Sequence, residues 1–195
     1  MIEIPFYNDF FSLISPKNKN EIIAHCLDSS IELPKEEFEW GEVCLSEKVS
    51  LRPTEFTELL KPYIIEALSE VVDVQYKFSV DEVWKNTYHR YYHQEQHDHH
   101  DFELSFVIFM NDSQENDAQF YFVNERQRVS STNWSEVSTN LMADNCTIEE
   151  KKGDILFFPS HMLHGVSPHK SDTPRITISG NISVECTGIP LIDSA

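Results

Sequence analysis

The chain has 195 residues, 40% of them hydrophobic and 12% aromatic, so its length and composition suit one globular domain with a sizeable core. Its 33 acidic and 15 basic side chains give a formal net charge of −18, which disfavours nucleic acid and anionic membrane surfaces as partners. No stretch approaches the roughly 20 apolar residues of a membrane span, and no signal peptide is recognisable, so we expect a cytoplasmic protein.

Two helices are predicted in the N-terminal part of the chain. Ser15 and Pro16 have the residue types of an N-cap and a first helical position, and the apolar residues of "KNKNEIIAHCLDSS" form one stripe. A second apolar stripe, with three- and four-residue spacing, predicts a helix around residues 54–72 with a kink at Pro62.

The pattern after Val74 changes to short β-branched and aromatic runs separated by polar segments. The runs "VQYKFSV", "LSFVIFM", "AQFYFVN", "DILFFP" and "RITISGNISVE" predict the strands of one sandwich or barrel. A long polar stretch over residues 111–153 is typical of a functional loop. We therefore expect a mainly β single domain over residues 1–195, with helical support over 1–75, a β core over 76–187 and a tail over 188–195.

The segment "HDHHD" at residues 97–101 is a candidate metal site, although a solvated turn would have a similar composition. Alternate side chains of an extended segment share a face, so His97 pairs with His99, or His99 pairs with Asp101. Imidazole and carboxylate ligands suit Fe(II), Mn(II) or Zn(II), and His164, after an apolar run, supplies a third. A preference for two histidines and one carboxylate favours His99, Asp101 and His164 as the ligands.

A carboxylate receptor is predicted one strand later. Arg175 and Thr177 are two residues apart in "RIT", so they share a face of the strand. A guanidinium binds a carboxylate through two parallel bonds, and a hydroxyl adds another. The alternative is that Arg175 lies in solvent on an edge strand.

These motifs occur together with others in the second half of the chain. They are Trp84-Lys85-Asn86, His97-Asp98-His99, Leu104-Ser105-Phe106-Val107, Gly153-Asp154 through Pro159-Ser160, His164-Gly165-Val166-Ser167-Pro168 and Arg175-Ile176-Thr177. Over roughly residues 83–185 the chain resembles the Fe(II)- and 2-oxoglutarate-dependent oxygenases, in particular a prolyl-hydroxylase-like branch common in marine bacteria and their phages. The resemblance implies a double-stranded β-helix core, similar to jelly rolls and cupins, with N-terminal helices packed against it.

The resemblance also implies the cofactors and the site. With Fe(II), 2-oxoglutarate and O₂ the protein would hydroxylate an unactivated C–H, for which the similarity to prolyl hydroxylases suggests a prolyl residue in a protein, and would yield succinate and CO₂. The motif spacing from Trp84 implies the alternative ligand set His97, His99 and His164. Arg175 and Thr177 would bind 2-oxoglutarate, Tyr88 and Asn86 would line its pocket, and no further catalytic residue is assigned.

The nature of the substrate is less defined. The acidic 111–150 segment and the net charge favour a cationic substrate, either a protein or peptide or a small molecule. The rival functions are a cupin-like metal-binding module or isomerase without 2-oxoglutarate, and a non-catalytic protein that retains the fold. The cupin-like module would not need Arg175 together with Thr177, and a non-catalytic protein would be expected to have lost His164, Arg175 or one of the proximal ligands, all of which are present. The sequence does not define an oligomeric state.

Overall fold

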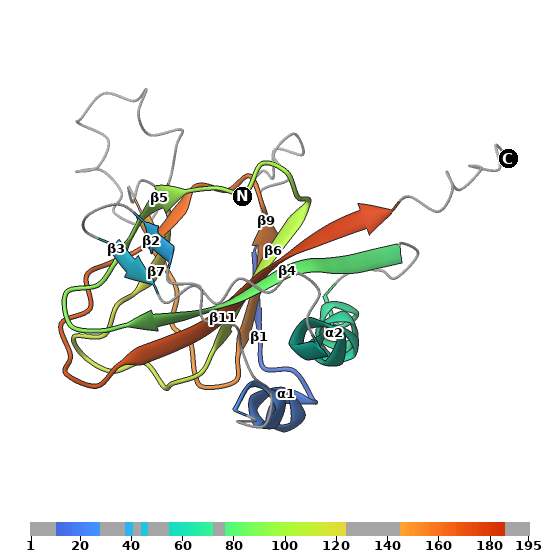
Figure 1. The fold of residues 1–195 in the computed structure, drawn as a ribbon, viewed down its shortest axis with the longest axis horizontal. Helices are drawn as coiled ribbons and strands as arrows, with labels where there is room; N and C mark the ends of the chain where they lie inside the picture. Colours follow the sequence, from blue (N-terminus) through green and yellow to red (C-terminus); the bar gives the residue numbers. More distant parts are fainter. Residues whose placement is uncertain are drawn as a thin grey trace, which may run out of the picture.

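The computed structural model describes residues 11–27, 38–40, 44–46, 55–71, 77–123 and 145–185 (Figure 1). Within these ranges the chain forms two helices and eleven strands. In chain order they are β1 (Ser12–Ile14), α1 (Lys19–Cys26), β2 (Phe38–Trp40), β3 (Cys44–Ser46), α2 (Glu55–Leu68), β4 (Lys77–Tyr88), β5 (Gln94–His97), β6 (Leu104–Phe109), β7 (Phe120–Val123), β8 (Asn145–Thr147), β9 (Ile155–Pro159), β10 (His164–Val166) and β11 (Arg175–Glu185).

Nine of the strands form two antiparallel sheets. The major sheet has the order β1-β9-β6-β11-β4, the minor sheet has the order β5-β10-β7-β8, and β2 pairs with β3 separately. The longest strands, β4 and β11, pair along their whole length at one side of the major sheet, with β4 as its edge strand. This is the mainly β architecture that the sequence predicts.

The two faces of the major sheet bury different cores. Leu60 and Ile64 of α2 pack with Ile22 of α1 against one face, so both helices lie on the outer side of this sheet (Figure 1). The other face packs against the minor sheet through aromatic residues such as Phe109 and Phe158. Because strand side chains alternate between faces, "LSFVIF" in β6 is buried on both sides.

The N-terminal part differs from its prediction in two ways. Helix α1 begins at Lys19, with Asn18 in place of Ser15 at the N-cap position, and the Asn18 side-chain amide donates to Glu66 of α2 at 2.9 Å. In addition, β1 extends the major sheet by pairing with β9. In the described ranges no helix is long and apolar enough to cross a membrane.

Candidate active site

Three histidines meet at the facing ends of two short strands. His97 ends β5 and His164 begins β10, and the two are register partners in the minor sheet. His99 follows two residues later, where its backbone N–H donates to the Ser160 carbonyl at 2.8 Å. One ligand atom from each of the three imidazoles lies within 4.8 Å of the others.

Backbone carbonyls orient two of these rings. Nδ1 of His97 lies 2.8 Å from the Glu95 carbonyl, and Nδ1 of His164 lies 2.7 Å from the Met162 carbonyl. A carbonyl only accepts, so each Nδ1 carries the proton and each Nε2 keeps a lone pair. This is the arrangement that prepares a histidine to bind a metal through Nε2.

His164 is the most buried of the three ligand candidates, with 3% of its surface exposed. Its ring stacks on Phe120 at a centroid distance of 5.3 Å and contacts the edge of Phe158 at 4.9 Å. Burial lowers the pKa of His164 well below the ordinary histidine value, and the neighbouring His97 and His99 lower it further. The imidazole is therefore neutral at pH 7 and available as a ligand.

Asp101 does not join this group. The chain turns after His99, and the Phe102 backbone N–H donates back to the His99 carbonyl at 3.2 Å, which leaves Asp101 exposed. Nε2 of His100 lies 3.0 Å from Oδ1 of Asp98, and neither residue belongs to the group of three converging imidazoles. Of the two ligand sets that the sequence left open, the structure gathers His97, His99 and His164.

The opposite wall of the cavity comes from β4 and β11. Arg175 is paired in register with Tyr88, and Thr177 with Asn86, and all four line the same cavity as the three histidines. The Asn86 amide donates to Oγ1 of Thr177 at 3.3 Å, and its Oδ1 accepts from Gln94 of β5 at 3.4 Å. Asn86 thus connects the two sheets beside the predicted carboxylate receptor.

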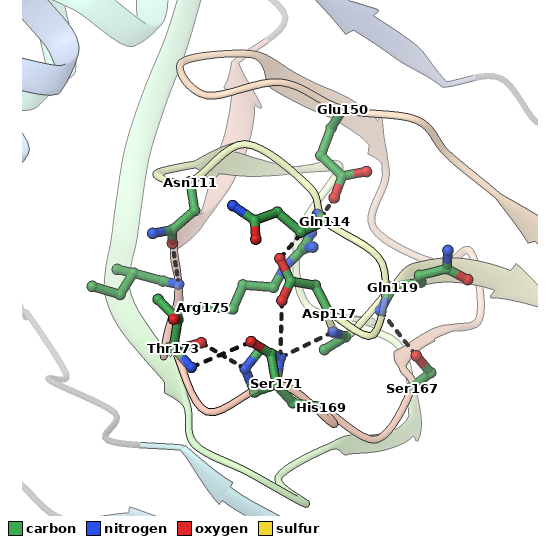
Figure 2. A network of polar contacts seen from close by, with 12 residues as sticks. Asn111, Gln114, Asp117, Gln119, Glu150, Ser167, His169, Ser171, Thr173 and Arg175 are labelled. Carbon is green, nitrogen blue, oxygen red and sulfur yellow. Dashed lines mark hydrogen bonds and ion pairs between the residues drawn. The ribbon is translucent and has the colours of Figure 1, made fainter.

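Arg175 is buried, with 4% of its surface exposed, so it does not lie in solvent. One terminal nitrogen donates to Oε1 of Glu150, which is also buried (Figure 2). The guanidinium carbon lies 5.5 Å from the ring centre of Phe109. A guanidinium has five N–H donors, so this single bond holds the group in place and leaves donors for a ligand in the cavity.

A fully buried histidine fixes the loop that leads into Arg175. Nδ1 of His169 accepts from the Ala118 backbone N–H at 3.1 Å, so Nε2 carries the proton and donates to the Thr173 carbonyl at 2.8 Å (Figure 2). The His169 backbone also bonds to Tyr91 and Tyr92. These bonds join three loops at the Arg175 end of the cavity.

The residues that sequence reasoning missed are Glu150, His169 and Glu82. Glu150 and His169 lie outside any periodic run, so no local pattern identifies them. Glu82 lines the cavity, and it is two residues before Trp84 on the same strand. Extending the alternation of Trp84, Asn86 and Tyr88 by one step would have found it.

The donor set fits a divalent first-row metal ion. Three imidazoles suit Fe, Ni, Cu or Zn, although non-haem Fe(II) oxygenases more often combine two histidines with a carboxylate. A metal held there would share the cavity with a buried guanidinium and hydroxyl. The arrangement therefore suits a ligand that chelates the metal at one end and carries a carboxylate at the other.

Residues 82–181, about half of the chain, match the family model described as "Putative 2OG-Fe(II) oxygenase". The chain belongs to this family. Fe(II) and 2-oxoglutarate are therefore the cofactor pair of this oxygenase, as the resemblance implied. The curated protein sequences contain no match to it.

Solved structures agree on the fold. The epimerase SnoN of nogalamycin biosynthesis superposes with a TM-score of 0.67 at 14% identity, over 90% of this chain and 76% of SnoN. HygX of Streptomyces hygroscopicus, with nickel and 2-oxoglutarate bound, has a TM-score of 0.60 at 12% identity, over 89% of this chain and 82% of HygX. EvdMO1 matches with a TM-score of 0.60 at 14% identity, over 90% of this chain but only 47% of EvdMO1. The oxygenase has the double-stranded β-helix fold that the sequence resemblance implied.

Proposed function

We propose that this oxygenase is a hydroxylase, which converts an unactivated C–H of its substrate to C–OH and consumes 2-oxoglutarate and O₂ to yield succinate and CO₂. The observation that supports this most is a single cavity lined by three metal-competent imidazoles and by a buried arginine. The cavity therefore contains residues that can bind the metal ion and residues that can bind the carboxylate of 2-oxoglutarate.

His97, His99 and His164 would hold the metal ion. Fe(II) with 2-oxoglutarate supplies an oxidant that is strong enough for an unactivated C–H. Backbone carbonyls hold Nδ1 of His97 and of His164, which leaves Nε2 of both rings for the metal. Phe120 and Phe158 pack on His164 and limit the access of water to it.

Arg175 and Thr177 would bind the far carboxylate of 2-oxoglutarate. The guanidinium supplies paired donors, and the Thr177 hydroxyl supplies another on the same face of β11. Tyr88 and Asn86, opposite them on β4, would complete that end of the pocket. These assignments explain why a β core contains so many polar side chains.

Hydroxylation is the reaction that we favour for this site, while the fold itself supports other outcomes. SnoN is an epimerase and SnoK is a carbocyclase, and both share the fold. A prolyl residue as the target stays a prediction. Analysis of the oxidised product, once a substrate is found, distinguishes added oxygen from epimerisation or ring closure.

The decisive experiment is anaerobic addition of Fe(II) and 2-oxoglutarate with a record of the visible metal-to-ligand charge-transfer band. We expect the band in the wild type and in His100→Ala, whose exposed ring lies outside the cluster. We expect its loss in His164→Ala and in Arg175→Ala. Iron binding to folded wild type without the band would instead favour a cupin-like metal module.

A further inference from the structure

One wall of the cavity changes from basic to acidic along two paired strands. Alternate residues of β4 and β11 face each other in cross-strand pairs, and all but Asn181 line the cavity. The pairs, in order, are Tyr88 with Arg175, Asn86 with Thr177, Trp84 with Ser179, and Glu82 with Asn181. A strand rises about 3.3 Å per residue, so successive pairs lie about 7 Å apart and the end pairs about 20 Å apart.

The metal cluster lies nearer to the acidic end of this wall. The rings of His99 and Trp84 are in contact, with centroids 5.5 Å apart. The Trp84 pair is one step from Glu82 and two steps from Arg175 along the strands. If 2-oxoglutarate extends from the metal toward Arg175, the space on the Glu82 side is left for the second substrate.

The carboxylate of Glu82 is held in place by buried polar groups. Ser105 Oγ donates to Oδ1 of Asn181 at 2.9 Å and lies 2.9 Å from Ser160 Oγ. The Asn181 amide must then present its nitrogen to Glu82, and it donates to Oε2 at 3.3 Å. At most 2% of Ser105, Ser160 or Asn181 is exposed, so the groups that hold Glu82 are buried, while Glu82 itself is exposed to solvent where it lines the cavity.

The same carboxylate has capacity for a ligand. The bond from Asn181 uses one oxygen, and within the described ranges no lysine or arginine forms an ion pair with Glu82. The register of β4 and β11 shifts just past this pair, and such bulges often re-aim a side chain beside an active site. Trp84, on the same face, adds an aromatic ring of the kind that attracts cations.

We propose that the substrate of this oxygenase carries an ammonium or guanidinium group, and that Glu82, positioned by Asn181, binds it. This inference rests on the proposed function, because it assigns the Arg175 end of the cavity to 2-oxoglutarate. The expectation that the acidic 111–150 segment recognises a cationic substrate stays a prediction.

The test is ligand-observed NMR with protein loaded with Ni(II) and 2-oxoglutarate, which does not turn over. The probes are n-butylguanidinium and its neutral isostere n-butylurea. We expect the guanidinium to bind wild type more tightly than the urea, and Glu82→Gln to weaken it about tenfold through loss of a charge-assisted bond. Glu58→Gln makes the same charge change at an exposed position of α2, and its affinity should equal that of wild type.

Equal affinity of wild type and Glu82→Gln for the guanidinium, equal weakening by Glu58→Gln, or no binding to wild type would each overturn the inference. Titration of Ni(II)-loaded wild type with 2-oxoglutarate alone separates this from the proposed function. If 2-oxoglutarate binds and the cation is not selected, only the inference about Glu82 fails. If 2-oxoglutarate does not bind, the proposed function fails, whatever the guanidinium does.

Discussion

The two sheets contribute different chemistry to one cavity. The minor sheet supplies His97 and His164 from the ends of strands that are four and three residues long, and backbone carbonyls aim their rings. The major sheet supplies Arg175, Thr177 and their partners from successive positions at one end of two long paired strands. Short strands bring donors to a point, whereas long strands set donors at regular intervals.

This difference predicts how substitutions in each sheet affect the protein. Metal ligands act together, so removal of one donor removes the site. Arg175, Thr177 and their partners Tyr88 and Asn86 are buried, so their removal costs stability as well as binding. Substitutions in the two sheets should therefore separate function from stability.

The largest effect should be the loss of metal affinity when a histidine of the cluster is replaced, and it should also distinguish the two ligand sets. Loss of an outer partner of a metal ligand costs roughly 10–100-fold in affinity, so loss of a ligand should cost more than about 100-fold. We expect this for His97→Ala in an anaerobic Fe(II) titration, and near-wild-type affinity for Asp101→Ala. The reverse pattern would assign the metal to His99, Asp101 and His164.

The next effect concerns the buried ion pair between Arg175 of the major sheet and Glu150. Arg175→Met leaves the Glu150 carboxylate buried without its partner, which should lower the free energy of unfolding by about 3–5 kcal/mol. The double variant Arg175→Met with Glu150→Met should recover most of this in urea denaturation. Binding of 2-oxoglutarate, followed by calorimetry, should stay lost in both. A double variant no more stable than the single one would refute this account.

Two glycines allow the same methyl group to be added to each sheet. At Gly180 of β11 a Cβ would lie 2.4 Å from the Glu82 carbonyl oxygen and 2.5 Å from the Phe106 ring. Neither group can yield easily, so Gly180→Ala should cost about 1–3 kcal/mol of unfolding free energy.

At Gly165 of β10 the nearest atom is Oη of Tyr121, at 2.8 Å. This is the far end of a half-buried side chain that can move. Thermal or urea unfolding of Gly165→Ala should therefore show a smaller loss than Gly180→Ala. A larger loss would mean that the minor sheet is the more rigid of the two.

The smallest effect should occur where β4 and β11 leave the core. Lys77 and Glu185 form an ion pair at 2.6 Å, but their side chains are 67% and 61% exposed. Lys77→Ala should lower the free energy of unfolding by only about 0.2–1 kcal/mol, and high salt should abolish the difference. A loss of unfolding free energy as large as that of Gly180→Ala would show that the exposed end of the β4–β11 pair contributes as much stability as its buried part.

The sequence by itself determined the β core, the main strands and the chemical groups of the site. Period-two alternation and short apolar runs are local signals, so "LSFVIFM", "DILFFP" and "RITISGNISVE" could be assigned to strands without a structure. Arg175 and Thr177 belong to one such run, and their spacing alone places both on one face.

Only the tertiary structure decided which groups act together. The turn after His99 directs Asp101 into solvent, and a turn of this kind depends on contacts such as the one between His99 and Ser160. Glu150 reaches Arg175 from 25 residues away, and Glu82 meets Asn181 from 99 residues away. Contacts between segments so distant in sequence have no local pattern, because they arise when separate strands pack into one core.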